Sequence, residues 1–318
     1  MTELELLAQH VSEGLAAPQK ALSPAWFYDD EGSRLFQQIM ALPEYYLTRA
    51  EHALLEARGD ELAALIDPAG QPLDLVELGS GDGSKMLGLL GRLRARNPGT
   101  VYRPVDLSEH ALTELTRRFG EQLPELTLAP VRGDYFNAWP PAGAGRRQVA
   151  LYMGSNLGNQ DQPGALSLLR RIRGKLRPGD ALVLGLDMVK DPRVILAAYH
   201  DGQGVTARFN LNLLARLNRE LGMDFALDRF AHYACYNPLD GAARSFLVSA
   251  LTQEVHSSHL GRSFHFAAGE TIYTEQSQKY TPAMVQALAE QSGFEPAGLL
   301  LDEAGWYGLA FWRVADKG

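Results

Sequence analysis

The chain has 318 residues and a formal net charge of −8, because 30 Lys and Arg face 38 Asp and Glu. With 46% hydrophobic and 21% charged residues it has the composition of a globular protein with a substantial core, which excludes a disordered or fibrous chain. The acidic balance disfavours nucleic acid as a partner, and the length suggests about two domains.

The cysteine count and the start of the chain indicate the cellular compartment. The single cysteine, Cys235, has no partner for an internal disulfide, so nothing points to an oxidising environment. Residues 1–7 carry two glutamates where a signal peptide has a basic head and an apolar run. No stretch approaches the roughly 18 consecutive apolar residues of a membrane helix. We therefore expect a cytoplasmic protein without a membrane partner.

Strand and helix patterns alternate in the first two thirds of the chain. An apolar strand at 73–78 is followed by a loop with three glycines and by a helical pattern over 85–96. Such alternation is typical of a doubly wound parallel sheet. The further predicted strands are 101–105, 126–131, 148–153 and 181–186, and the further predicted helices are 108–119 and 165–176.

Beyond residue 190 the alternation ends. Helices are predicted at 192–199 and at 211–221, the second ending at Gly222, and a mixed α+β insertion follows with strands at 231–236, 244–251 and 262–266. The tail predicts a helix at 282–292 and strands near 296–301 and 306–313 that complete the sheet. The predicted domains are therefore 54–190 plus 281–318 and, for the second, 1–53 plus 191–280.

The glycine loop indicates the class of ligand. Residues 77–83 have the form E-x-G-x-G-x-G at the carboxyl end of a strand, where open α/β sheets bind ligands, whereas a dinucleotide fingerprint has G-x-G-x-x-G. Glu77 and Asp82 bring negative charge to the loop, which suits a cationic ligand better than a pyrophosphate. S-adenosylmethionine (SAM), with a sulfonium and an ammonium, fits. The alternative is a dinucleotide-dependent oxidoreductase.

Acidic residues also follow the next two predicted strands. Asp106 stands where a carboxylate accepts ribose hydroxyls, and Asp134 with Tyr135 stands where an adenine amino group and ring are bound. Each aspartate would equally serve as a helix cap. The order of these residues at three successive strand ends favours SAM.

The segment 154–159 follows the fourth strand of this series. Methyl transfer from a sulfonium to a nitrogen is a direct displacement, so an enzyme must hold a neutral amine in line with the methyl carbon. Asn159, and as a second choice Asn156, is the candidate for this task. The alternative is a turn in which these side chains bond to the local backbone.

Several short sequence words are shared with a known family, in order from about residue 15 to the C-terminal end. They are Trp26-Phe27-Tyr28-Asp29, Leu42-Pro43-Glu44-Tyr45-Tyr46, Val76-Glu77-Leu78-Gly79-Ser80-Gly81, Gly154-Ser155 with Gly158-Asn159, Gly204-Val205-Thr206-Ala207 with Phe209-Asn210, Asn218-Arg219-Glu220-Leu221, and Thr274-Glu275 with Ser277. The chain thereby resembles the histidine Nα-methyltransferases of ergothioneine biosynthesis. The resemblance implies a Rossmann-like, SAM-dependent methyltransferase core with a second α+β substrate-binding domain. It also implies methylation of the α-amino group of L-histidine, up to trimethylated hercynine.

Residue roles follow from the resemblance, position by position. It implies that Tyr28, Asn159 and Tyr199 hold the α-amino and carboxylate groups, with Asn159 and Tyr28 in the catalytic role. Glu275 and Ser277, together with Tyr45, would face the imidazole, whose two ring nitrogens suit a carboxylate and a hydroxyl. Thr206 and Phe36 would line the pocket. The positions implied for SAM are Glu77, Gly79, Lys85, Asp106, Asp134 and Tyr135.

One departure from the family bears on the substrate. Ser245 stands where the family has a methionine that contacts the substrate ring, and a serine enlarges the pocket. Related enzymes act on indole amino acids, so the alternative substrate is tryptophan or another aromatic amino acid, although Glu275 is a poor partner for an indole. A noncatalytic SAM-binding protein is a further alternative. We expect a monomer acting on a small molecule, without a metal, since His256 and His259 have only Glu254 nearby.

Overall fold

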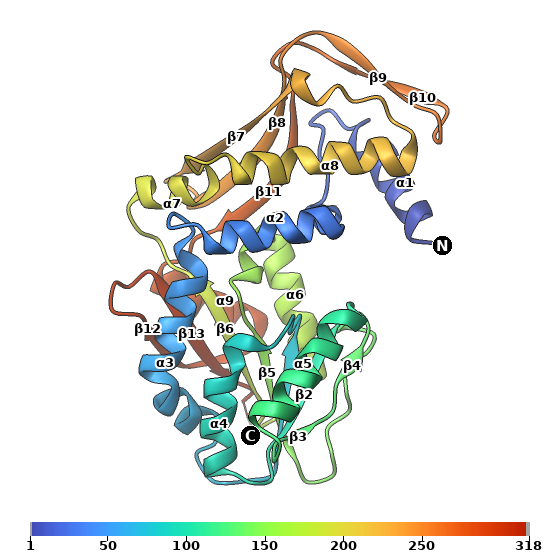
Figure 1. Ribbon diagram of the computed structural model, residues 1–318. Helices are drawn as coiled ribbons and strands as arrows, with labels where there is room; N and C mark the ends of the chain where they lie inside the picture. The colour runs from blue at the N-terminus through green and yellow to red at the C-terminus, as the bar shows by residue number, and fades with distance from the viewer. Residues whose placement is uncertain (1, 316–318) are drawn as a thin grey trace. The chain divides into compact units, whose positions relative to one another are not determined.

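The computed structural model describes residues 2–315, which form two compact units (Figure 1). One unit comprises the chain up to Tyr46 together with Lys190–Gln278, and the other comprises Leu47–Val189 together with the chain from Lys279 onward. The first boundary lies at residue 46, where the sequence suggested 53. The reason is α3 (Tyr46–Ile66), a continuous helix whose Leu54 and Leu55 pack into the core of the second unit.

The second unit is built on a sheet of eight strands among the described residues. Its order is β12-β13-β6-β5-β1-β2-β3, with β4 also beside β2, and the strands β1, β2, β5 and β6 are parallel. The C-terminal hairpin adds antiparallel strands next to β6, which confirms that the tail completes a doubly wound sheet. The strands are β1 (Leu73–Leu78), β2 (Val101–Asp106), β3 (Thr127–Leu128), β4 (Val131–Arg132), β5 (Arg147–Tyr152), β6 (Ala181–Asp187), β12 (Glu295–Leu301) and β13 (Tyr307–Arg313).

The single strand predicted over 126–131 is wrong, because the chain forms β3 and β4 there instead. Pro130 separates them, and a proline has no N–H to donate to the ladder. Both short strands still pair in parallel with β2, through Leu128 with Tyr102 and through Val131 with Val105. The carboxyl end of the third strand therefore remains next to that of β2.

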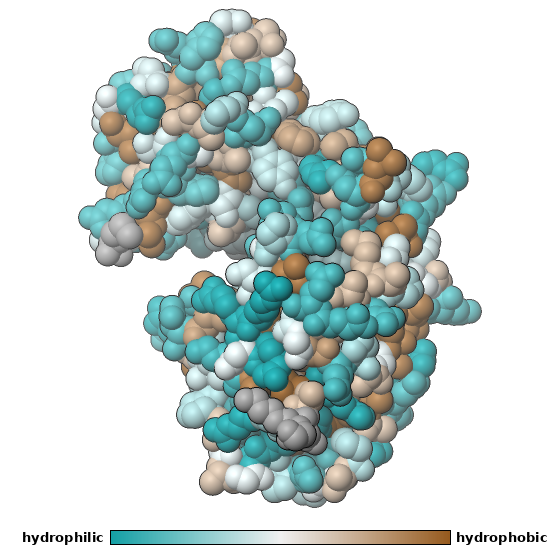
Figure 2. Space-filling view, turned by 180° about the vertical axis from the view of Figure 1, so that it is seen from behind, coloured by the Kyte–Doolittle hydropathy of each residue, from teal (hydrophilic) through white to brown (hydrophobic). Residues whose placement is uncertain are grey.

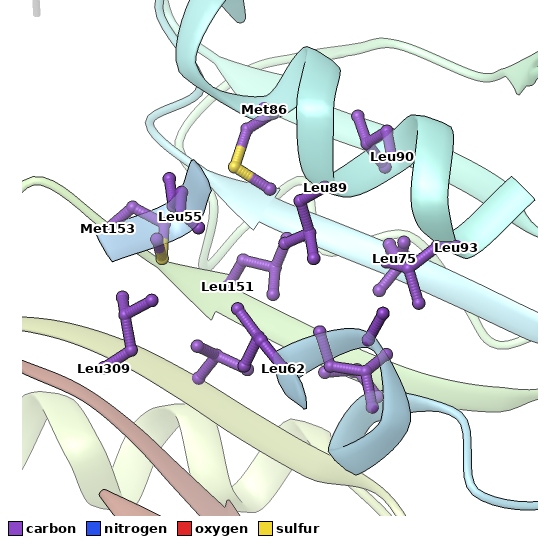
Figure 3. Close-up of a cluster of buried hydrophobic side chains, with 14 of the residues drawn as sticks. Leu55, Leu62, Leu75, Met86, Leu89, Leu90, Leu93, Leu151, Met153 and Leu309 are labelled. Atoms are coloured by element: carbon purple, nitrogen blue, oxygen red, sulfur yellow. The ribbon is translucent and has the colours of Figure 1, made fainter. Parts of the chain in front are cut away.

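Helices cover both faces of this sheet. Residues of α3, α4 (Leu87–Arg96) and α5 (Glu109–Gln122) share one apolar core with the sheet, part of which Figure 3 shows between Leu89 of α4, Leu151 of β5 and Leu309 of β13. Residues of α6 (Gln162–Lys175) and α9 (Pro282–Ser292) form a second core on the opposite face. Strand β1 is buried along its whole length between these layers. The layers fix the carboxyl ends of the strands as the edge at which a ligand is accessible.

The first unit combines helices with a sheet of order β11-β8-β7 and a β9–β10 hairpin. Helix α8 starts at Val205, earlier than the predicted 211, because the Asp201 carboxylate accepts hydrogen bonds from the N–H groups of Val205 (2.9 Å) and Thr206 (2.8 Å). Gly222, with φ 55°, ends the helix as predicted. The elements are α1 (Glu3–Gly14), α2 (Asp30–Ala41), α7 (Pro192–Tyr199), α8 (Val205–Leu221), β7 (Phe230–Asn237), β8 (Ala242–Ser249), β9 (Gln253–Ser257), β10 (Arg262–Phe266) and β11 (Thr271–Gln278).

On the face shown in Figure 2 the surface is largely hydrophilic, with apolar side chains scattered over it. Within residues 2–315 no helix has the length and apolar character needed to cross a membrane.

Candidate functional site

The glycine loop after β1 presents its backbone to open space. Gly79, Gly81 and Gly83 all have positive φ, at 71°, 55° and 67°, which side chains other than glycine rarely adopt. The N–H of Gly79 donates to the Val105 carbonyl of β2 (2.9 Å), which turns the loop back over the sheet. A Cβ added at Gly79 or Gly81 would meet no atom within 4 Å. A ligand can therefore approach the main chain closely at both positions.

Asp106, at the end of β2, is tied to this loop. Its Oδ2 accepts a hydrogen bond from the Gly81 N–H (2.9 Å), and its Oδ1 accepts one from the Ser108 N–H (2.9 Å). The helix-cap alternative for Asp106 is wrong, because Ser108 caps α5 through its own side chain. A carboxylate has about four acceptor positions. Asp106 thus keeps capacity for two ribose hydroxyls beside the loop that it holds.

Asp134 and Tyr135 follow β4. The Asp134 carboxylate stabilises a local turn by accepting hydrogen bonds from the Phe136 N–H (2.7 Å) and the Asn137 amide (3.2 Å). Asp134 is exposed. The Tyr135 ring lies 6.2 Å from the Tyr152 ring at the end of β5, measured between centroids. An aromatic surface is therefore present at the strand ends where the adenine was expected.

Glu77 is fully buried at the end of β1. Its Oε2 accepts the hydroxyl hydrogen of Tyr102, whereas its Oε1 has no hydrogen-bond partner in the described chain. Burial raises the pKa of this carboxyl to about 7, against the opposing effect of the Lys85 charge. Although desolvation acts to lower it, the pKa of Lys85 is raised by the carboxylates of Glu51 and Glu77. Lys85 is consequently a charged ammonium in an acidic surrounding.

Asp82, which we expected to bring negative charge to the loop, does so within an ion pair. Its carboxylate pairs with the Arg118 guanidinium at 2.9 Å and accepts the Ser84 hydroxyl at 2.8 Å. The buried acid at the loop is instead Glu77. Glu77, which is fully buried at the loop, is therefore the acid that favours a cationic ligand over the pyrophosphate of a dinucleotide.

The segment after β5 contains two successive residues in the left-handed region, Gly154 (φ 74°) and Ser155 (φ 58°). Backbone strain of this kind at a non-glycine residue is concentrated at functional sites. The Asn156 amide donates to the Met153 carbonyl (3.0 Å), so Asn156 serves the turn. Asn159 ends the following 3-10 helix, is half-buried, and its amide bonds to no other group between residues 2 and 315. Of the two candidates, Asn159 is the one available to a substrate.

The other unit brings the predicted aromatic residues together around α8. Tyr28 packs edge-on against Phe36 (5.6 Å between ring centroids), and Phe36 packs edge-on against Tyr45 (6.2 Å). Phe209, which sequence reasoning did not assign to the site, contacts both Tyr28 (5.8 Å) and Phe36 (5.9 Å). Phe209 follows Thr206 by three residues and so lies on the same face of the helix, from which its place in the site could have been predicted. Thr206 lies in the first turn of α8 and Tyr199 ends α7, and both are buried.

A β-bulge in β11 decides where Glu275 lies. Tyr273 pairs with Phe246 of β8 and Glu275 pairs with Ser245, so the extra residue Thr274 shifts the register between them. Because neighbouring residues of β8 face opposite sides of the sheet, Glu275 and Tyr273 do so as well. Glu275 therefore shares a face with Ser245, which is 1% exposed and whose Oγ has no hydrogen-bond partner among the described groups.

Ser277 follows Glu275 on the same face, opposite Ala243. Desolvation and then the charge of Glu275 raise the pKa of the Tyr28 phenol, so the carboxylate acts on the aromatic residue expected to hold the substrate. This face thus offers a carboxylate, two hydroxyls and small neighbours.

Together, the order of the parallel strands, the open glycine loop at the end of β1 and the acid at the end of β2 define a SAM-dependent methyltransferase. Comparison with known proteins narrows this class. The model of the SAM-dependent, histidine-specific methyltransferases matches residues 7–314, and the chain belongs to that family. The fold class, the cofactor and the family predicted from the sequence are confirmed.

Two bacterial relatives are similar over nearly the whole chain. The histidine N-alpha-methyltransferase of Mycobacterium tuberculosis is 38% identical over 304 residues, which cover 96% of this chain and 94% of that protein. The enzyme of the same description from Mycolicibacterium smegmatis is 38% identical over 309 residues, with the same coverage of 96% and 94%. Ergothioneine biosynthesis protein 1 of Neurospora crassa is 29% identical over 280 residues, 84% of this chain and 30% of that longer protein.

Proposed function

We propose that this protein transfers methyl groups from SAM to the α-amino nitrogen of L-histidine, up to trimethylated hercynine, in ergothioneine biosynthesis. The observation that carries the proposal is the β-bulge at Thr274, which puts Glu275 and Ser277 on one face and leaves Tyr28 under the influence of the Glu275 charge. A carboxylate accepts the N–H of an imidazole, and a hydroxyl engages its second nitrogen. Phenylalanine offers neither group.

The sheet unit binds the cofactor in this proposal. Asp106 accepts the ribose hydroxyls, and Asp134 and Tyr135 bind the adenine. The Lys85 ammonium pairs with the SAM carboxylate, and the unpartnered Oε1 of buried Glu77 accepts the SAM ammonium. Bound SAM supplies an electrophilic methyl group on a sulfonium. The main chain at Gly79 and Gly81 has the open space that close approach of the cofactor requires.

The remaining residues hold the amino acid. Tyr28 and Tyr199 bind the carboxylate and the amine, and Asn159 orients the amine through its amide oxygen. An amide performs this task well because it accepts an N–H without competing as a nucleophile, and the lone pair of the neutral amine stays directed at the methyl carbon. Tyr45, Phe36 and Thr206 line the pocket.

Ser245 supports one alternative, methylation of tryptophan or another aromatic amino acid. Its side chain and that of Ala243 are small, and both face the same side as Glu275. Small residues at these two positions favour a larger ring such as indole, whereas the partly buried Glu275 carboxylate favours imidazole, whose ring N–H it can accept.

The proposal is tested by incubating the purified protein with SAM and each of the twenty amino acids and measuring products by mass spectrometry. Histidine should be converted to mono-, di- and trimethylated species, and the other amino acids should remain unmodified. Preferential methylation of tryptophan would replace the histidine assignment by its alternative, and no methylation of any amino acid would refute both. A monomeric state and a cytoplasmic location stay predictions.

A further inference from the structure

Glu51, on α3, lies at the centre of a polar cluster and has no role of its own in the function proposed above. Its residue is 4% exposed, and its Oε1 accepts hydrogen bonds from the Gly154 N–H (2.8 Å) and from the Tyr307 hydroxyl (2.7 Å). Its Oε2 lies 3.4 Å from the Lys85 ammonium. One carboxylate thereby connects the lysine that follows β1, the turn that follows β5 and the first residue of β13.

The neighbouring strand leaves space for this cluster. At Gly185, inside buried strand β6, an added Cβ would lie 2.4 Å from the Tyr307 hydroxyl, 3.0 Å from the Glu51 carboxylate and 3.1 Å from the Gly154 nitrogen. Glycine weakens a strand interior and often marks a close approach of other groups. The cluster is therefore accommodated by the sheet and is not a casual contact between flexible side chains.

The charges of the cluster show what Glu51 contributes. A partly buried ammonium is stabilised in its charged form by a paired anion, and the Glu51 carboxylate contacts Lys85. The Glu51 carboxylate also fixes the main chain at Gly154, the first residue of the left-handed turn that leads to Asn159. One oxygen of the Glu51 carboxylate thus contacts Lys85, and the other fixes the turn that leads to Asn159.

We propose that Glu51 is a positioning residue for the cofactor. It holds the Lys85 ammonium in place for the carboxylate of SAM and holds the Gly154–Ser155 turn in its left-handed conformation, without touching SAM itself. This inference rests on the proposed function, in which Lys85 binds the amino-acid end of SAM.

The decisive variant is Glu51→Gln, which keeps the shape and the acceptor for Gly154 and Tyr307 but removes the charge that pairs with Lys85. Affinities for S-adenosylhomocysteine and for 5′-methylthioadenosine, which lacks the amino-acid end, are measured by calorimetric titration. We expect binding of S-adenosylhomocysteine to weaken about tenfold, in line with the loss of one charge-assisted interaction, and binding of 5′-methylthioadenosine to stay unchanged. Glu56→Gln, an exposed carboxylate on the same helix, is the matched control and should alter neither.

Further variants separate this inference from the proposed function. If Lys85→Met leaves the affinity for S-adenosylhomocysteine unchanged, the proposed role of Lys85 fails. If Lys85→Met weakens binding and Glu51→Gln does not, only the positioning role is overturned. Equal weakening of both ligands by Glu51→Gln would also overturn it, because that result indicates general structural damage. The double variant should bind no more weakly than Lys85→Met alone.

Should Glu51→Gln fail to fold, Tyr307→Phe removes one hydrogen bond to the same carboxylate. It should weaken S-adenosylhomocysteine selectively and by a smaller factor, and an unchanged ratio of the two affinities would contradict the inference.

Discussion

Replacing Glu275 by alanine tests the assignment of the imidazole partner. The carboxylate lies on the face of β11 that the bulge at Thr274 turns toward Ser245, and the alanine variant removes it while leaving the hydroxyl of Ser277. A hydrogen bond to a charged group contributes roughly 1.5–3 kcal/mol. Because about 1.4 kcal/mol corresponds to a factor of ten, kcat/KM for histidine should fall by roughly 10- to 150-fold.

The loss should be selective. Tryptophan and phenylalanine do not offer Glu275 an imidazole N–H, so the alanine variant should lose less activity on them, or gain some through the room left by Ser245. The assay compares kcat/KM for the three amino acids in the wild type, in Glu275→Ala and in Glu275→Gln, which keeps a neutral acceptor and should lie between them. Glu254→Ala, an exposed carboxylate on β9 of the same unit, is the control and should leave the ranking unaltered.

A second readout, the free energy of unfolding, separates a role in substrate binding from a role in the fold. An unchanged substrate ranking in Glu275→Ala, with protein stability reduced, would refute the reasoning, because the carboxylate would then serve the fold alone.

Three further predictions concern the unit built on the eight-stranded sheet. Asp106→Ala should weaken SAM at least tenfold in calorimetric titration, because it removes the acceptor for two ribose hydroxyls, and unchanged affinity would dismiss that assignment. Asn159→Ala should lower kcat about 100-fold with little change in SAM affinity, since an amine misplaced by about 1 Å reacts that much more slowly. The control, Asn156→Ala, should chiefly lower the melting temperature. If Asn159→Ala reduces SAM binding and turnover in parallel, Asn159 is a turn residue. The pKa of Glu77 is about 7 in the folded protein, above its ordinary value of about 4.5, so the folded state holds this proton more tightly. The resulting contribution to stability is complete below about pH 4.5 and is lost as the pH rises through 7. Glu77→Gln should remove this decline, about 3 kcal/mol at most, and identical pH profiles of unfolding in variant and wild type would contradict it.

Sequence patterns predicted the parts of the site that depend on local order. The loop after β1 is recognisable because glycine at three alternate positions permits positive φ, and Asp106 is recognisable because it directly follows a strand. The Asn156 turn was likewise open to inference, since an asparagine within a turn segment commonly bonds the local backbone.

Features that depend on contacts distant in sequence were not predictable. Asp82 forms an ion pair with Arg118 of α5, which is 36 residues away in the sequence. The bulge at Thr274 arises from the pairing of β11 with β8, and the residue types in β11 do not predict it. Helices α1, α2 and α3 were not among the elements predicted from the sequence.

The central claim is that the α-amino nitrogen of histidine receives the methyl groups, and it is tested most directly by locating them in the product. The protein is incubated with L-histidine and SAM carrying a ¹³C-labelled methyl group, and the product is analysed by fragmentation mass spectrometry and NMR. We predict three equivalent labelled methyl groups on the α-nitrogen and an unmodified imidazole ring. Label on a ring nitrogen, or label in tryptophan but not histidine when both are supplied, would contradict the account.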